Sequence, residues 1–169
     1  MIRFLCAAFL LATGFAYAQE KPQFQIQSPA FKANEEIPAK YTCQGGDVSP
    51  ELTFANIPSN AKTLVLTVFD PDAPEGTWVH WVLYNVKPTD KIGENAIPGE
   101  QALNDFGKYT YSGPCPSDDK QHRYVFRAYA LDSAILVDEG MTMKDVEKAI
   151  GRHVIAKSEL IGLYRKPLW

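Results

Sequence analysis

Hydrophobic positions recur along this chain in short runs with the two-residue period of β-strands. The run from Leu64 to Phe69 is continuously apolar and rich in branched and aromatic residues, which is typical of a buried strand. The run from 78 to 86 alternates and predicts a second strand, with His80, Val82, Tyr84 and Val86 on one face and Val79, Trp81 and Leu83 on the other. A third run, 122–131, predicts a strand with His122, Tyr124 and Phe126 on one face.

Weaker patterns predict the remaining elements. Short strands are expected at 23–27, 52–54 and 158–164, and the Pro-, Gly- and Asp-rich stretch 87–100 is expected to be mostly loop. One helix is expected from Thr142 to about His153, because apolar residues recur there at helical spacing and Thr142 with Asp145 forms a capping signal. This balance predicts a mainly β fold, an antiparallel β-sandwich with one or two peripheral helices.

Residues 1–18 have the pattern of a secretory signal peptide. A short basic start at Arg3 is followed by an apolar segment, and Ala16 and Ala18 provide the small residues that signal peptidase requires. Cleavage is therefore expected after Ala18. We expect a periplasmic or secreted protein with one domain, 19–169, and no transmembrane segment in the mature chain.

The charge and the cysteines of the mature chain add two expectations. The chain has 17 basic and 20 acidic residues, and loss of Arg3 leaves 16 basic residues and a net charge of −4. A mildly acidic domain without a basic stripe argues against a nucleic-acid partner. Cleavage also leaves only Cys43 and Cys115, which predicts one disulfide in an exported protein, with two buried free thiols as the alternative.

Candidate chemistry gathers where the predicted strands begin and end. If the first two strands pair as an antiparallel hairpin, Asp70, Asp72 and His80 meet at one rim of the sheet, and His122 starts its strand in the same way. Both histidines are expected at the rim and not in the core. The alternative is purely structural, since Asp-Pro commonly opens a turn and a histidine on a strand is often a packing residue.

The chain resembles the phosphatidylethanolamine-binding proteins, which include the Raf kinase inhibitor proteins, and it is most similar to their bacterial branch. Asp-Pro-Asp-Ala-Pro at 70–74 and His-Arg-Tyr at 122–124 form the most specific pair of motifs. The matching stretches cover most of the mature chain: 49–52, 70–74, 78–81, 104–107, 113–116 and 122–124.

The resemblance implies an antiparallel β-sandwich with a small pocket that binds a phosphate-like anion or a phospholipid headgroup. It implies ligand-binding roles for Asp70, Asp72, Trp78, His80, Gly113, Pro114, His122 and Tyr124. The sequence departs from the family at 117–120, where Ser-Asp-Asp-Lys replaces the usual lysine–glycine turn. This departure is expected to place negative charge near the mouth of the pocket.

Three other functions compete with headgroup binding. The pocket rim can serve as a protein-interaction module that inhibits a kinase or protease, although no protein target is identified. A hydrolase can use His80 or His122 as a general base, and Asp70, Asp72, His80 and His122 can hold a metal ion. We expect a non-enzymatic protein without cofactor or metal, because no Ser or Cys lies beside a base at a motif spacing.

Overall fold

The computed structural model describes residues 22–136, 138 and 140–167, so the predicted signal peptide and its cleavage site lie outside the described residues. The strands are β1 (Gln25–Gln27), β2 (Leu52–Ala55), β3 (Thr63–Asp70), β4 (Trp78–Val86), β5 (Lys91–Ile92), β6 (Glu100–Gln101), β7 (His122–Leu131) and β8 (Val154–Tyr164). The helical elements are α1 (Met143–Ile150) and the 3-10 turns η1 (Ala39–Tyr41) and η2 (Gly151–His153).

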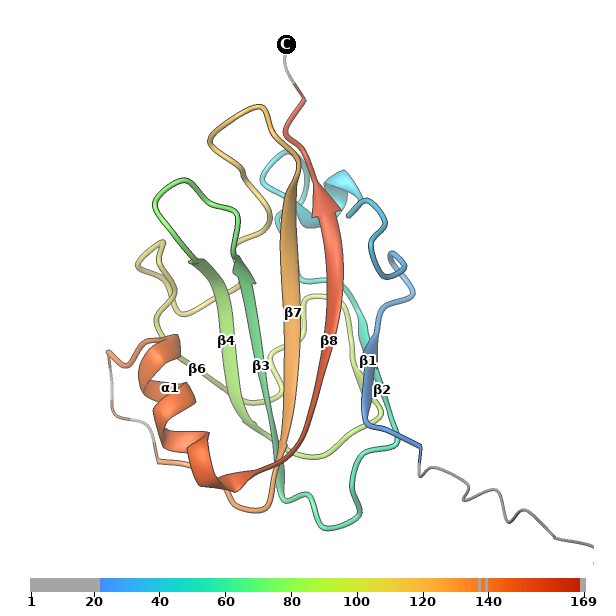
Figure 1. The fold of residues 1–169 in the computed structure, drawn as a ribbon, viewed down its shortest axis with the longest axis vertical. Helices are drawn as coiled ribbons and strands as arrows, with labels where there is room; N and C mark the ends of the chain where they lie inside the picture. Colours follow the sequence, from blue (N-terminus) through green and yellow to red (C-terminus); the bar gives the residue numbers. More distant parts are fainter. Residues whose placement is uncertain (1–21, 137, 139, 168–169) are drawn as a thin grey trace, which may run out of the picture.

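Two antiparallel sheets form the fold, which confirms the predicted mainly β class. The larger sheet has the strand order β6-β4-β3-β7-β8, and the smaller one has the order β1-β2-β5. Residues of β1 and β2 pack in one hydrophobic cluster with one face of the larger sheet, whereas residues of α1 pack in a second cluster with its other face. The helix and the small sheet therefore lie on opposite sides of the larger sheet (Figure 1).

The central strand β3 explains the continuous apolar run in the sequence. All eight of its residues are buried, because the small sheet covers one of its faces and α1 covers the other. Leu64, Leu66 and Val68 belong to the first cluster, and Val65 and Phe69 to the second. A strand that is covered on both faces has apolar residues at successive positions, because neither face is in contact with water.

The predicted faces of β4 are wrong at both ends of the strand, because two β-bulges interrupt its alternation. In the pairing with β3, His80 is an extra residue between Val79 and Trp81, and a second irregularity includes Asn85, whose φ is 53°. Each extra residue turns the following side chains to the other face. Val79 therefore joins the cluster of α1, and Val86 joins the cluster of the small sheet.

The end of the chain differs from the prediction in its boundaries. The helix begins as predicted, with the Asp145 carboxylate accepting from the Thr142 N–H at 2.9 Å, but it ends at Ile150 and gives way to η2. Strand β8 starts at Val154, four residues earlier than predicted. Within the described residues, no helix is both long and apolar enough to cross a membrane.

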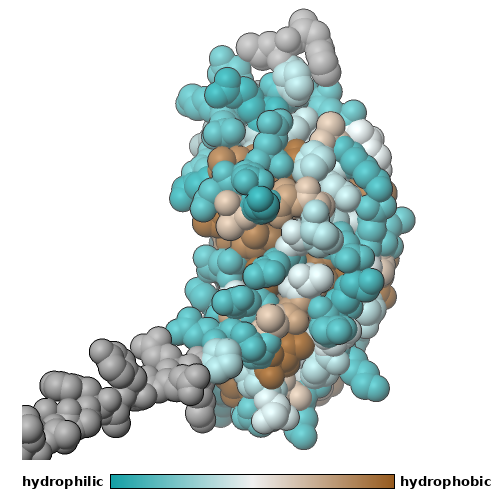
Figure 2. Space-filling view, turned by 90° about the vertical axis from the view of Figure 1, so that its right-hand side faces the viewer, coloured by the Kyte–Doolittle hydropathy of each residue, from teal (hydrophilic) through white to brown (hydrophobic). Residues whose placement is uncertain are grey.

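Hydrophilic residues cover most of the side of the molecule shown in Figure 2, which is the right-hand side of Figure 1, where β1, β2 and β8 lie. Hydrophobic residues are visible there only as separate patches. The apolar side chains of the small sheet, such as Ile26 and Phe54, are 4% and 6% exposed and face the larger sheet. The small sheet therefore acts as a cover for one side of the core.

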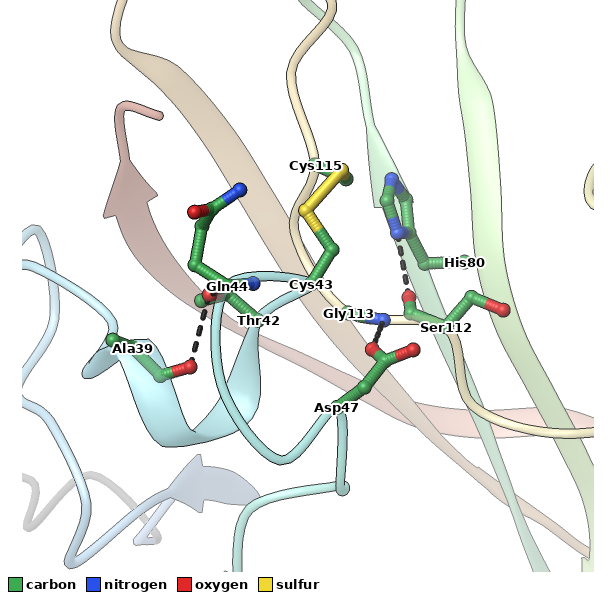
Figure 3. The surroundings of a disulfide bond; sticks show 9 residues. All are labelled: Ala39, Thr42, Cys43, Gln44, Asp47, His80, Ser112, Gly113 and Cys115. Carbon is green, nitrogen blue, oxygen red and sulfur yellow. Dashed lines mark hydrogen bonds between the residues drawn. A yellow bond between two sulfur atoms is a disulfide. The ribbon is translucent and has the colours of Figure 1, made fainter. Parts of the chain in front are cut away.

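The predicted disulfide between Cys43 and Cys115 is confirmed, with 5.5 Å between the two Cα atoms. It joins the segment after η1 to the loop that precedes β7 (Figure 3). Hydrogen bonds reinforce this junction, since the Cys43 N–H donates to the Pro114 carbonyl at 3.2 Å and the Gly113 N–H donates to the Asp47 carboxylate at 2.6 Å. Two surface loops are thereby held together at one end of the sandwich.

Replacing both cysteines with serine is expected to lower the free energy of unfolding by about 2–4 kcal/mol, because the bridge closes a long loop in the unfolded chain. Denaturant unfolding of the oxidised protein and of the Cys43→Ser/Cys115→Ser variant measures the difference. Mass spectrometry of the non-reduced wild type should detect no free thiol. Equal stability of the two proteins, or two titratable thiols in the wild type, would contradict the proposed role of the bridge.

Candidate functional site

A cavity of about 320 Å³ lies where the β3–β4 loop and the loop before β7 meet. Both loops project from the same end of the larger sheet, at the top of Figure 1. Four of the residues predicted from the sequence line this cavity: Asp70, Trp78, His80 and His122. The antiparallel pairing of β3 with both β4 and β7 brings them together, since the end of β3 lies beside the starts of its two neighbours.

Asp70 and His122 form a buried pair at the base of the cavity. The Nδ1 atom of His122 is 2.7 Å from Oδ2 of Asp70, and the other carboxylate oxygen accepts from the Asp72 N–H at 2.8 Å. The two residues are 3% and 1% exposed. On the opposite side of the ring, Nε2 of His122 lies 3.0 Å from Oδ1 of Asp118. Because carboxylates only accept hydrogen bonds, this arrangement favours an imidazolium with both nitrogens protonated.

His80 presents a different protonation pattern. Its Nδ1 lies 2.7 Å from the carbonyl oxygen of Ser112, as Figure 3 shows, and a carbonyl can only accept. Nδ1 therefore carries the proton, and in the neutral ring Nε2 is an acceptor. Within the described part of the chain, Nε2 of His80 has no hydrogen-bond partner. The two imidazoles of the cavity thus differ, one held in the charged form and one suited to the neutral form.

The segment Asn104–Gly107 holds the bulge that carries His80. The Asn104 side-chain amide donates to the carbonyl of His80 at 3.1 Å, and the Asp105 carboxylate accepts from the N–H of Val79 at 2.7 Å. The Asn104 oxygen accepts from the N–H groups of Phe106 and Lys108, which fixes the turn itself. The irregular strand is therefore stabilised by side chains from a neighbouring loop.

Phe106 is a wall of the cavity that the sequence prediction did not include. Its ring centroid is 5.7 Å from that of Trp78 and 5.2 Å from that of His80, both in edge-to-face geometry. The loop residues Ala73, Pro74, Glu75, Cys115, Pro116 and Ser117 complete the lining. Phe106 lies in the stretch 104–107 that carries the family resemblance, and this was the only signal in the sequence that pointed to it.

Four of the predicted ligand-binding residues lie outside the cavity lining. Tyr124 lies beneath it in the hydrophobic core, fully buried, with its ring centroid 5.2 Å from that of His80. The carboxylate of Asp72 is turned to Arg123, with Oδ2 accepting from the Arg123 Nε at 2.9 Å. Gly113 and Pro114 lie against the 41–47 segment, where a Cβ on Gly113 would collide with the Tyr41 carbonyl. Tyr124, Gly113 and Pro114 are therefore buried neighbours of the lining, whereas Asp72 ties the β3–β4 loop to Arg123.

The two histidines are buried and not at an exposed rim, which corrects the expectation from the sequence. Burial lowers the pKa of His80 below 6.5. For His122 burial also lowers the pKa, but the Asp70 and Asp118 carboxylates outweigh it, and the net shift raises the pKa above 6.5. Burial next to Asp70 strongly raises the pKa of Tyr124, so its hydroxyl stays protonated at neutral pH.

The alternative of a metal site receives no support from the described residues. Among them, no group of three or more His, Cys, Asp or Glu side chains is arranged to hold a metal ion. Asp72 is engaged by Arg123, and both ring nitrogens of His122 are engaged by carboxylates.

Residues 27–165 match the family model described as phosphatidylethanolamine-binding protein. A UPF0098 protein of Chlamydia pneumoniae is 45% identical to this chain, and the match covers 84% of this chain and 99% of the relative. A UPF0098 protein of Pyrococcus horikoshii is 43% identical, and the match covers 88% of this chain and 79% of the relative. Two crystal structures share the fold. One, described as a phosphatidylethanolamine-binding protein homologue of Chlamydia trachomatis, is 43% identical with a TM-score of 0.82 over 86% of this chain and 99% of that one. The other, Escherichia coli YbcL, is 29% identical and has a TM-score of 0.80. The match covers 86% of this chain and 100% of YbcL.

Replacing Asn104 with alanine is expected to destabilise the fold by about 1–3 kcal/mol, because buried backbone groups lose their hydrogen-bond partner. The ring resonances of His80 should also shift, since the bulge loses its lateral support. Denaturant unfolding and NMR measure the two effects. Asn60→Ala is the matched control, because Asn60 is exposed and lies outside this cavity. Equal losses in the two variants would contradict this role of Asn104.

The two cavity histidines are expected to titrate on opposite sides of pH 6.5. The stability that His122 contributes is present below pH 6.5 and is lost as the pH rises through its raised pKa. The stability linked to neutral His80 is present above pH 6.5 and is lost as the pH falls through its lowered pKa. An NMR pH titration of the assigned ring resonances measures both pKa values, and a reversed order would overturn the assignment.

Proposed function

The chain belongs to the phosphatidylethanolamine-binding protein family, and on that premise we propose that its cavity binds a small phosphate-bearing group, either a free phosphate-like anion or a phospholipid headgroup. The observation that carries this proposal is the convergence of His80, His122 and Asp70 on one cavity with aromatic walls. A concave site with a few converging polar groups is the usual form of a small-molecule site.

The chemistry of the cavity suits a group that carries both a phosphate and a cation. Imidazole N–H groups donate to phosphate oxygens, and neutral His80 can accept from the P–OH of a singly charged phosphate. The rings of Trp78 and Phe106 can face an ammonium group, as aromatic rings do in many ammonium sites. Glu75, on the exposed loop of the lining, adds a carboxylate for the same cation.

The volume of the cavity limits what can enter it. At about 320 Å³ it lies near the lower end of the range for ligand sites, which begins at about 300 Å³. A phosphate or a headgroup has a suitable size, whereas the acyl chains of an intact lipid would stay outside. We therefore expect weak binding, because so small a group offers few contacts.

We further propose that the protein binds its ligand without turnover and acts outside the cytoplasm. The disulfide supports the second point, because structural disulfides persist mainly in oxidising compartments. It also occupies the thiol of Cys115, a residue of the cavity lining, which cannot act as a nucleophile while bridged. Measurable hydrolysis of a simple phosphate monoester or carboxylic ester by the purified protein would contradict binding without turnover.

The His122→Asn variant is expected to bind inorganic phosphate about tenfold more weakly than the wild type, because a charge-assisted hydrogen bond becomes a neutral one. His153→Asn is the matched control, since His153 also pairs with an aspartate, Asp132, but lies away from the cavity. This variant should stay within about twofold of the wild type. Binding to the wild type should weaken as the pH rises through the raised pKa of His122.

The titrations use NMR, with inorganic phosphate, phosphoethanolamine and vesicles containing phosphatidylethanolamine as separate ligands. Tighter binding of phosphoethanolamine than of phosphate would favour a headgroup, and binding to vesicles would show that the headgroup is accessible in a bilayer. Chemical-shift changes that map away from Trp78, His80 and His122 would contradict the proposed site. Equal affinity of the wild type, His122→Asn and His153→Asn for inorganic phosphate would also contradict it.

A further inference from the structure

The carboxylate of Asp118 occupies the position through which His122 would contact a ligand. Its Oδ1 atom lies 3.0 Å from Nε2 of His122, while Nδ1 of the same ring is already bonded to Asp70. An imidazolium has only two N–H donors. A phosphate oxygen that accepts from His122 must therefore replace the oxygen of Asp118.

The two carboxylates on His122 differ in how readily they can leave the ring. The Asp70 side chain is 4% exposed, and its second oxygen is held by the Asp72 N–H. The Asp118 side chain is 26% exposed and belongs to the short 117–121 loop, where it also accepts from the Lys120 N–H at 3.0 Å. A buried carboxylate cannot leave its partner without a large desolvation cost, whereas a partly exposed one can exchange its partner for water or another anion at a smaller cost.

We propose that Asp118 is a built-in competitor that sets the charge preference of the cavity, disfavouring bare anions relative to ligands that carry their own cation. This inference rests on the proposed function and names the residue that selects among phosphate-bearing ligands. When an oxygen of the ligand takes the place of Asp118 on His122, the displaced carboxylate stays close to the cavity mouth. There it repels a phosphate without a counter-charge and attracts an ammonium group.

The neighbouring residue, Asp119, provides a matched control. It lies in the same loop, is exposed, and has no hydrogen bond to His122 in the described structure. Asp118→Asn and Asp119→Asn change the net charge by the same amount and keep the side-chain shape. A difference between them reports the contacts of Asp118, which are with His122 and with Lys120 of its own loop, rather than the overall charge of the protein.

The test measures the affinities of the wild type, Asp118→Asn and Asp119→Asn for inorganic phosphate and for phosphoethanolamine by NMR titration. Asp118→Asn should bind phosphate about tenfold more tightly than the wild type, since the ligand no longer displaces a charged competitor. Its preference for phosphoethanolamine over phosphate should fall about threefold or more, because the attraction for the ammonium group is lost. Asp119→Asn should stay within about twofold of the wild type for both ligands.

Two results would overturn the inference while leaving the proposed function intact: equal phosphate affinity in Asp118→Asn and the wild type, or an equal gain in Asp119→Asn. A phosphate site that is detectable only in Asp118→Asn would support it. Absence of binding at the cavity in the wild type and in both variants, for both ligands, would overturn the inference and the proposed function together. The His122 ring resonances of the ligand-free variants check that the pair with Asp70 remains intact.

Discussion

The site depends on one buried carboxylate, that of Asp70 at the end of the central strand. A buried charge requires partners, and Asp70 has two, the N–H of Asp72 and the ring of His122. Removing one partner of such a buried pair typically costs about 3–5 kcal/mol, so Asp70 fixes both the turn after β3 and the start of β7. The cavity therefore lies at an end of the sheet where the fold already holds a buried charged pair.

The second constraint is the bulge in β4, which decides where His80 points. His80 is the residue that the bulge leaves without a register partner on β3, and its Nδ1 lies 2.7 Å from the Ser112 carbonyl. The bulge is supported by Asn104 and Asp105, whose loop also brings Phe106 to the cavity. The same loop thus stabilises an irregular strand and builds an aromatic wall, which gives the stretch 104–107 a structural role and a place in the site.

The sequence was sufficient to predict the strands that carry a strong hydrophobic signal, and β7 has the predicted bounds. It could not predict β5 and β6, since two-residue strands have no periodicity.

The predicted faces of β4 were wrong because the alternation of apolar and polar residues does not show where a bulge occurs. The family resemblance implied that Tyr124 lines the cavity. Tyr124 lies two residues beyond His122, about 7 Å along the strand, and is fully buried in the core instead. For Asp118, the sequence predicted only a negative charge near the mouth of the cavity. Its contact with Nε2 of His122 depends on the geometry of the loop, which the sequence pattern does not give.

The disulfide lies beside the candidate site and outside the hydrophobic core. The two main clusters of buried hydrophobic residues contain neither cysteine, and Cys43 is exposed, whereas Cys115 lines the cavity. The bridge therefore anchors the start of the segment that continues into the buried Pro116 and then into Ser117 and the partly exposed Asp118. The pairing of β3 with β7 determines where Asp70 and His122 lie, whereas Asp118 reaches His122 from a loop whose first residues the bridge anchors. The site thus combines a buried charged pair, positioned by the larger sheet, with a partly exposed carboxylate that a short loop supplies.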